Sequence, residues 1–370
     1  MKTYVVGGAI RDRLLGLSVK DLDYVVVGAT PEEMIQNGFK PVGQDFPVFL
    51  HPITHAEYAL ARTERKTAPG YKGFVFHADA SVTLLQDLAR RDLTINAMAQ
   101  EVDAGGQLVG DIIDPYGGQE DLKKKLFRHV GPAFIEDPLR VLRVARFSAR
   151  FADFSIAPET LDLLQNISRS GELKALVKER VWQELKKGLS ADYPSKMLDV
   201  LAACDAIHEI FHGAFDGNYP KKFFNYVDAS AHQHMKLPQR YAALCHGLEV
   251  DAIDDLSNKL SAPVECKDYA ILTNQLVSSL SHDDISLGAE NLLSILDRMD
   301  VWRKPERFFE LLEVVRLTSR STSEIEQAYK FAKTVDVADI ARSVTGGAGD
   351  VIKLAIQRAR VKAIEAGGVA

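Results

Sequence analysis

Two aspartates separated by one residue, Asp21 and Asp23, stand immediately before the apolar run "YVVVG". Alternate residues of a β-strand share a face, so the two carboxylates are expected to converge on one point. Converging carboxylates suit Mg²⁺, which prefers hard oxygen ligands and usually retains waters and substrate phosphates. Glu57 begins a second expected strand, "EYALAR", and is the candidate for a third catalytic carboxylate. A solvated turn before a strand is the alternative interpretation of the pair.

A glycine pair, Gly7-Gly8, lies between the expected strand "TYVV" and an expected helix that begins near Ala9. Glycine lets the backbone approach a ligand closely, and the free N–H groups at a helix start attract phosphate. Arg11, one turn into this helix, can add its charge to the same phosphate. Asp21 follows closely enough to leave room for only one helix and a return strand. A phosphate seat beside a metal site resembles the polymerase β-like nucleotidyltransferase superfamily.

The segment "RRDLTINA" places Arg91 and Asp92 just before an expected helix. Asp92 and Asn96 are four residues apart and share a helical face if Asp92 lies at its start. Arg91 can hold a phosphate or ribose oxygen, and Asp92 can accept a hydrogen bond from a ribose hydroxyl. The alternative is that Asp92 only caps the helix.

The segment "EDPLRVLR" is expected to open a helix on which Asp137 and Arg140 are neighbours, with Arg143 continuing the stripe. Cytosine and adenine each offer an amino donor beside a ring-nitrogen acceptor, which a carboxylate and a guanidinium match. Uracil and guanine present the reverse pattern and leave a charged group unpaired, which gives strong discrimination. Alternatively, Asp137 caps the helix ahead of Pro138, which leaves Arg140 alone for the base. Both roles stay open, and Arg143 is a further candidate nucleotide contact.

The elements that must position these residues change character along the chain. Up to about residue 115, short β-rich runs alternate with Gly, Pro and Asn, and beyond it helical periodicity continues almost to the end. The predicted fold class is α+β, with a mixed sheet and short helices followed by all-α domains. We expect a catalytic head domain at 1–137, a helical neck for nucleotide and base selection at 138–205, and a helical C-terminal region at 206–370.

Composition narrows the class of protein. The chain has 370 residues, 46% hydrophobic and 26% charged, and its net charge of −6 excludes a globally basic nucleic-acid binder. Locally, residues 123–150 are strongly basic, which is suited to RNA. The three cysteines are far apart and predict neither a disulfide framework nor a zinc ribbon. With no signal peptide and no apolar stretch of membrane-spanning length, a cytoplasmic protein without membrane contact is expected.

Six segments occur in an order that resembles the class II CCA-adding enzymes (tRNA nucleotidyltransferases) of the bacterial type: "GGAIRD", "DLD", "ARTERK", "RRDLTINA", "EDPLRVLRVARF" and "ERVWQEL". The resemblance covers about residues 1–190. It implies Mg²⁺-dependent, template-independent addition of C, C and A to the tRNA 3′ end from CTP and ATP, with release of pyrophosphate. It also implies that tRNA is held at its acceptor end and elbow. From its local charge, the basic segment 123–150 is where we expect the acceptor end to dock. The candidate nucleotide contacts are Gly8, Arg11, Arg91, Asp92, Asp137, Arg140 and Arg143.

Two further segments bear on this resemblance. In the family, a loop at the position of "RTERKTAPGYKGF" helps the switch from C to A addition, which favours full CCA activity over CC-only or A-only addition. "ERVWQEL" is interpreted as packing support for the helix that selects the base, with Trp182 in the core.

The C-terminal region departs from the family. Relatives usually carry an HD-type phosphohydrolase domain with a His-Asp metal-binding pair, whereas here His246 is followed by Gly247. His232, His234 and His282 are candidate remnants of the other ligands. Without the aspartate, we expect a degenerate HD-like domain that supports RNA and lacks phosphohydrolase activity.

Two other functions compete with CCA addition. Bacterial poly(A) polymerase shares these motifs, but the acidic net charge and the lack of a basic tail disfavour it. A catalytically inactive tRNA-binding module is disfavoured because such a module needs no converging carboxylates.

Overall fold

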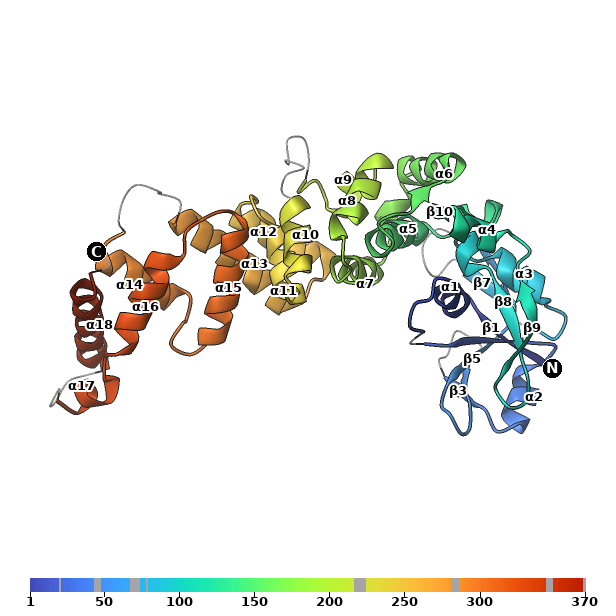
Figure 1. Ribbon diagram of the computed structural model, residues 1–370, viewed down its shortest axis with the longest axis horizontal. Helices are drawn as coiled ribbons and strands as arrows, with labels where there is room; N and C mark the ends of the chain where they lie inside the picture. The colour runs from blue at the N-terminus through green and yellow to red at the C-terminus, as the bar shows by residue number, and fades with distance from the viewer. Residues whose placement is uncertain are drawn as a thin grey trace. The chain divides into compact units, whose positions relative to one another are not determined.

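The computed structural model describes residues 1–19, 21–42, 48–66, 74–77, 79–215, 224–280, 287–343 and 349–368. The chain divides into two compact units (Figure 1). The first is formed by Met1–Gly188 and Lys196–Gly213, and the second by Leu189–Ser195 and Ala214–Ala370. The three-domain division expected from the sequence stays a prediction.

A seven-stranded sheet with the order β3-β4-β5-β2-β1-β8-β9 forms the centre of the N-terminal part. Its neighbouring strands are antiparallel except β2 and β5, which are parallel. The strands are β1 (Lys2–Val6), β2 (Asp23–Val27), β3 (Lys40–Val42), β4 (Val48–Leu50), β5 (Glu57–Leu60), β8 (Ala99–Val102) and β9 (Leu108–Ile113). Separate pairs are formed by β6 (Thr63–Lys66) with β7 (Phe74–His77) and by β10 (Leu126–Phe127) with β11 (Ser155–Ile156). The loop expected to assist the C-to-A switch falls largely on 67–73, outside the described residues.

The central strands bring the two opening motifs together. Val6, the last residue of β1, pairs with Asp23, the first residue of β2. Successive residues of β2 are buried on opposite faces: Val25 joins one apolar cluster with Val6, and Val26 joins another with Leu60. Because both faces are packed, the strand pair is fixed, and the glycine turn and the aspartates meet at one end of the sheet.

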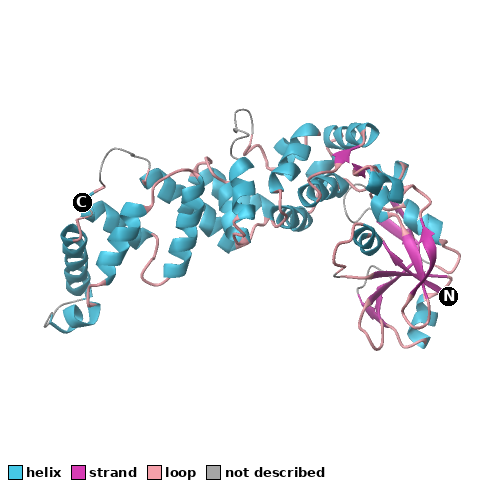
Figure 2. Cartoon of the chain, in the orientation of Figure 1, coloured by secondary structure: helices cyan, strands magenta, loops and turns pink. Residues whose placement is uncertain are grey.

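Short helices surround the sheet and longer ones follow it (Figure 2). Thr30 and Thr83 each accept from the third backbone N–H of the helix they precede, in capping boxes. The helical elements of this part are α1 (Gly8–Leu14), α2 (Pro31–Gln36), α3 (Leu84–Ala89), η2 (Thr94–Asn96), α4 (Gly118–Lys123), η3 (Pro132–Glu136), α5 (Leu139–Arg150), α6 (Pro158–Arg169), η4 (Glu172–Ala175), α7 (Lys178–Leu189), α8 (Pro194–Ala203) and α9 (Ile207–Ile210).

The remaining described elements are all helical. They are α10 (Phe224–His232), α11 (Leu237–Leu244), α12 (Val250–Leu260), α13 (Val264–Ser279), α14 (Gly288–Arg298), α15 (Pro305–Leu317), α16 (Ser323–Lys333), α17 (Val337–Ser343) and α18 (Gly349–Ala366). The predicted α+β class, a sheet with short helices followed by helical regions, is confirmed. None of the helices that the structure describes is both long and apolar enough to cross a lipid bilayer.

Two of the histidines singled out in the C-terminal region have aromatic neighbours. His246 lies edge-on to Tyr226, with ring centroids 5.1 Å apart, and His232 lies edge-on to Tyr193 at 5.2 Å. His282 is outside the described residues. Over the described ranges, no three His, Cys, Asp or Glu side chains are grouped so that they could hold a metal ion.

All three cysteines are free and buried. Cys204 lies in the first unit, and Cys245 and Cys266 lie in the second. Burial raises the pKa of the Cys204 thiol to about 11 and that of Cys245 to about 12.

Candidate active site

A cavity of about 900 Å³ lies within the first unit, where the glycine turn, the aspartate pair, α5 and α7 come together. Its lining contains twice as many basic as acidic side chains. The basic ones are Arg11, Arg62, Arg90 and Arg91 from the N-terminal part, Arg140, Arg143, Arg146 and Arg150 from α5, and Arg180 and Lys187 from α7. A polyanion such as a nucleoside triphosphate or an RNA end therefore suits this cavity.

Asp21 and Asp23 both line the cavity and are exposed. Neither carboxylate has a hydrogen-bond or ion-pair partner among the residues that the structure describes. Two exposed carboxylates on one cavity, with no cationic partner within the described part of the chain, are a donor set that fits a divalent metal ion.

The third candidate carboxylate, Glu57, is the first residue of β5. It and Asp23 immediately precede Tyr58 and Tyr24, which pair across the parallel strands β5 and β2 and stack with ring centroids 4.3 Å apart. Glu57 therefore starts the strand adjacent to Asp23. It is exposed and is not part of the cavity lining, so its catalytic role stays a prediction.

Gly7 makes room for Arg91. It has a φ of 70°, and a Cβ built on it would lie 2.8 Å from Arg91 Nη1. Arg91 Nη2 donates to Asp87 at 3.2 Å, while its buried Nε has no acceptor within the described chain. Gly8 is the first residue of α1, and a Cβ there would approach Arg11 Nη2 to 3.4 Å. The glycine pair thus allows two arginines to lie against the turn.

Arg11 is buried and well anchored although it lines the cavity. Its Nε donates to Asp12 Oδ1 at 2.9 Å and its Nη1 to Asn96 Oδ1 at 2.6 Å. The guanidinium lies 5.3 Å from the ring centroid of Phe147 on α5 and 5.1 Å from that of Phe151, which follows α5. Burial lowers the pKa of Arg11, and the adjacent Asp12 carboxylate opposes this shift. The arginine thereby links α1 to α5.

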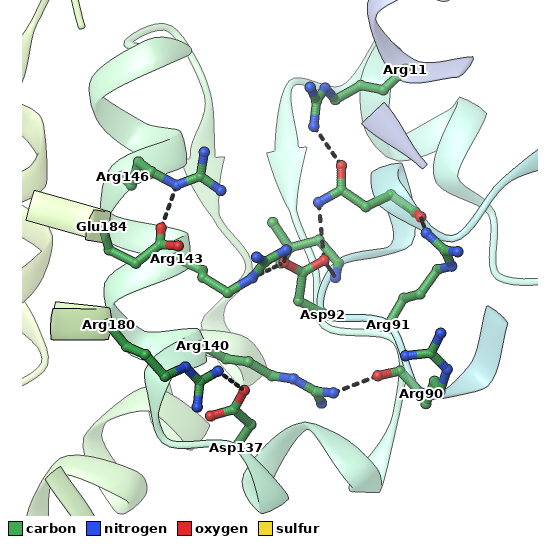
Figure 3. A network of polar contacts seen from close by, with 12 residues as sticks. Arg11, Arg90, Arg91, Asp92, Asp137, Arg140, Arg143, Arg146, Arg180 and Glu184 are labelled. Atoms are coloured by element: carbon green, nitrogen blue, oxygen red, sulfur yellow. Dashed lines mark hydrogen bonds and ion pairs between the residues drawn. The ribbon is translucent and has the colours of Figure 1, made fainter. Parts of the chain in front are cut away.

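Asp92 is buried, and its carboxylate accepts hydrogen bonds from several neighbouring groups (Figure 3). Its Oδ2 accepts from Arg143 Nε at 2.8 Å and lies 2.6 Å from Nη2, and its Oδ1 accepts from Asn96 Nδ2 at 3.0 Å and from the Leu93 N–H at 2.8 Å. Burial favours a raised pKa for Asp92, but the Arg143 charge and these hydrogen bonds outweigh it and lower the pKa. The expected helix after Asp92 is only the 3₁₀ turn η2, yet Asp92 and Asn96 do meet.

Asp137 has contacts that fit both of its possible roles. Its Oδ1 accepts from the N–H of Leu139, the first residue of α5, at 3.1 Å, although the N-cap residue itself is Pro138. Its Oδ2 lies 3.3 Å from Arg180 Nη2, and the residue lines the cavity. Arg140 donates through Nη1 to the Ala133 carbonyl at 2.8 Å and through Nη2 to the carbonyl of Arg90 (Figure 3). Base reading by this pair stays a prediction.

The segment "ERVWQEL" does more than pack. Trp182 is buried, as expected for a core residue. Arg180 contacts Asp137, and Glu184 forms an ion pair with Arg146 at 2.5 Å. These contacts went unrecognised in the sequence, although the four-residue spacing of Arg180 and Glu184 on α7 could have indicated a shared polar face.

The basic segment 123–150 divides into two parts. Lys125 pairs with Asp153 at 2.6 Å, and Arg128 pairs with Glu159 and lies 3.3 Å from Asp121. The four arginines of α5 instead line the cavity. Within this segment, the arginines of α5 are therefore the side chains that face the cavity and suit a polyanion.

Comparisons with known proteins add to this geometry. The Poly A polymerase head domain family matches residues 3–128, and the family described as a probable RNA and SrmB-binding site of polymerase A matches residues 153–216. The multifunctional CCA protein of Burkholderia mallei (strain SAVP1) is 47% identical over 416 residues, covering 100% of both chains. That of Burkholderia multivorans is 46% identical over 409 residues, covering 98% of both. Since 416 exceeds 370, some segments of the Burkholderia mallei relative have no counterpart here.

Solved structures share the fold. A CCA-adding enzyme in apo form II superposes with a TM-score of 0.73 at 24% identity, over 98% of this chain and 88% of that one. The Thermotoga maritima CCA-adding enzyme complexed with tRNA has a TM-score of 0.71 at 23% identity, over 99% and 87%. The polymerase β-like fold expected for the N-terminal domain is thereby confirmed.

Proposed function

This chain belongs to the family of bacterial CCA-adding enzymes, and we propose that it adds C, C and A to the 3′ end of tRNA from CTP and ATP, releasing pyrophosphate. The observation that carries the proposal is the cavity in which Asp21 and Asp23 lie beside the glycine turn and the arginines of α5. The identity of 46–47% to multifunctional CCA proteins, over 98–100% of this chain, supports the same substrates.

The fold implies use of a divalent metal ion, and we assign Mg²⁺ because the candidate ligands are hard carboxylate oxygens. Asp21 and Asp23 would hold it, and Glu57, on the adjacent strand, is the third candidate carboxylate. When bound, the ion supplies Lewis-acid activation of phosphoryl oxygens and of the attacking hydroxyl.

The chain's own residues position the substrates for in-line transfer. The tRNA 3′-hydroxyl attacks the α-phosphorus and pyrophosphate departs, without a covalent enzyme intermediate. Gly8, Arg11 and Arg91 bind the triphosphate, and all three residues line the cavity. Asp92 accepts from the ribose. Catalysis is then mainly positioning and charge stabilisation.

Base choice is assigned to α5. Asp137 accepts from the amino group of C or A while Arg140 donates to the ring nitrogen, and Arg143 adds a nucleotide contact. The Asp137 contact to Arg180, at 3.3 Å, is the one that a base can most readily replace. Uracil and guanine leave charged groups unmatched and are refused.

We also assign the protein to the cytoplasm, where tRNA, CTP and ATP are available and the free cysteines stay reduced. The helical region beyond the neck is proposed to support the tRNA elbow.

One gel tests the function. A tRNA that lacks its three terminal nucleotides is incubated with CTP and ATP, in magnesium and in a chelator. We expect three added residues in magnesium and none in the chelator. Long A tails on any RNA would indicate poly(A) polymerase, and a stop after two C residues or addition of A alone would indicate a partial enzyme. No addition to any tRNA would leave only a binding module.

A further inference from the structure

A buried carboxylate beside the cavity has no role in the scheme above. Asp12, on α1, is 8% exposed and lines the cavity. Its Oδ1 accepts from Arg11 Nε at 2.9 Å, and its Oδ2 accepts from Arg150 Nη2 at 2.9 Å. The two arginines come from different parts of the first unit, since Arg11 is on α1 and Arg150 is the last residue of α5. Asp12 therefore bridges the phosphate-binding helix and the base-selecting helix.

Both arginines of this bridge also contact one aromatic ring. The Arg11 and Arg150 guanidiniums lie 5.1 Å and 4.9 Å from the ring centroid of Phe151, within cation–π range. From Arg11 the contacts continue to Asn96 and on to Asp92. Asp12 thus lies at one end of a chain of hydrogen bonds that reaches residues assigned to the nucleotide.

Two guanidiniums this close repel each other, and the positive charge of Arg150 works against protonation of Arg11. A carboxylate between them offsets this repulsion and fixes the direction of both side chains through charge-assisted hydrogen bonds. An amide of the same shape offers one weaker acceptor and no charge. Without the carboxylate, Arg11 would keep only its bond to Asn96 among the described polar contacts.

We propose that Asp12 is a positioning residue for nucleotide transfer, which holds Arg11 toward the triphosphate and fixes Arg150 at the end of α5. It acts through these two arginines rather than by contact with the substrate. The inference rests on the proposed function, because it takes the triphosphate as the ligand of Arg11. Both nucleotides share the triphosphate, so CTP and ATP are affected alike and base choice is not.

A purely structural bridge is the competing explanation, and the chain offers a matched control. Asp121, on α4, is also a buried carboxylate, 5% exposed. It accepts from Thr94 Oγ1 at 2.7 Å and from Arg128 Nε at 3.3 Å, and it does not line the cavity. Asp121→Asn removes the same charge at similar burial without touching the site.

The experiment compares wild type, Asp12→Asn and Asp121→Asn in KM and kcat for CTP and ATP, equilibrium binding of each nucleotide, and thermal unfolding. For Asp12→Asn we expect about a tenfold higher KM and Kd for both nucleotides, with kcat within about threefold and the preference for C over U unchanged. Asp121→Asn is expected to change the unfolding temperature alone. Arg150→Gln is expected to weaken the binding of CTP and ATP less in the Asp12→Asn background than in wild type.

Equal nucleotide binding by Asp12→Asn and wild type would overturn the inference, as would an equal loss in Asp121→Asn. The binding measurement separates the inference from the proposed function. A wild-type protein that extends no tRNA, yet binds CTP more tightly than Asp12→Asn does, refutes CCA addition and supports the role of Asp12.

Discussion

The two cavity aspartates are the residues on which the metal assignment depends. Asp21→Ala and Asp23→Ala are each expected to lower nucleotide addition by about three orders of magnitude, because each removes a carboxylate assigned to the metal ion. Binding of tRNA, measured by filter retention, should persist because the basic side chains are untouched. Glu101→Gln is the control, since it removes only an exposed ion pair with Lys2. Unimpaired addition by both alanine variants would remove the metal assignment.

Asp92 should give the protein an acid-dependent stability. Burial favours a raised pKa for Asp92, but Arg143 and the hydrogen bonds to it lower the pKa in the folded state. A lowered folded pKa stabilises the protein above the unfolded value, about 4, and this stabilisation is lost as pH falls toward the folded pKa. Asp92→Asn should therefore lower the free energy of unfolding by about 2 kcal/mol at pH 7.

Urea unfolding of wild type and Asp92→Asn at pH 7, 5 and 3 checks this expectation. The difference between the two proteins should be equal at pH 7 and 5 and smaller at pH 3. A difference that is constant over the whole range would show that Asp92 carries no such linkage.

Gly7 should be needed for the position of Arg91. Gly7→Ala places a Cβ 2.8 Å from Arg91 Nη1, so the guanidinium must move, and we expect kcat/KM to fall about 100-fold. Gly110→Ala is the matched control, because Gly110 has a similar φ of 67° with open space around it. The control should lose about 1 kcal/mol of stability through backbone strain, with activity retained. Equal activity loss in both variants would show that strain alone matters.

Residue types and spacing were enough to select the candidate residues that line one cavity, among them Asp21, Asp23, Gly8 and Arg91. They were not enough to find the bridge from Asp12 to Arg150, whose partners are 138 residues apart in the chain. Local spacing carries no information on such a pair, because only the packing of α1 against α5 brings it together.

Among the elements, η2 shows how tertiary pairing overrides local pattern. The run after Asp92 has helical spacing, yet only Thr94–Asn96 forms a 3₁₀ turn. The following residues, Ala99–Val102, pair with β1 instead and complete the centre of the sheet. A strand partner almost a hundred residues earlier cannot be read from a local window, which explains the short helix.

The helix α5 was predicted from its sequence, and its arginine stripe should control base choice. Arg140→Ala removes the donor assigned to the ring nitrogen, so we expect discrimination against UTP to fall about tenfold or more before phosphoryl transfer is lost. The measurement is the ratio of kcat/KM for CTP and UTP on one tRNA.

Arg169→Gln on α6 is the control for this ratio, because Arg169 forms an exposed ion pair with Asp205 and does not line the cavity. Unchanged preference for CTP over UTP in Arg140→Ala would contradict base reading by Arg140.

For the molecule as a whole, the sequence predicted a catalytic N-terminal part and a helical C-terminal region, but not how the described chain divides into compact units. The second unit includes Leu189–Ser195, a segment that lies ahead of part of the first unit in the sequence. The assignment of Leu189–Ser195 to the second unit depends on contacts such as the hydrogen bond from the Ser195 N–H to Asp228 Oδ1, at 2.8 Å. The spacing of residues in the sequence does not encode such contacts.

The whole protein is expected to lack phosphohydrolase activity, because Gly247 follows His246 where the family resemblance implies a metal-binding aspartate. Incubation with 2′,3′-cyclic AMP or p-nitrophenyl phosphate, with Mn²⁺ or Ni²⁺ added, should release product only at the background rate. Metal-dependent turnover that disappears in His246→Ala would contradict the expectation. Turnover that persists in that variant would point to a contaminating enzyme.

The reactivity of the three buried cysteine thiols can report when each compact unit opens. With a pKa near 11 or 12 and no solvent access, Cys204 and Cys245 stay unreactive toward alkylating agents until the surrounding helices separate. Since Cys204 belongs to the first unit and Cys245 and Cys266 to the second, peptide mapping of the modified sites dates the opening of each unit. A substrate that binds in the cavity of the first unit should therefore slow the labelling of Cys204 more than that of Cys245 or Cys266.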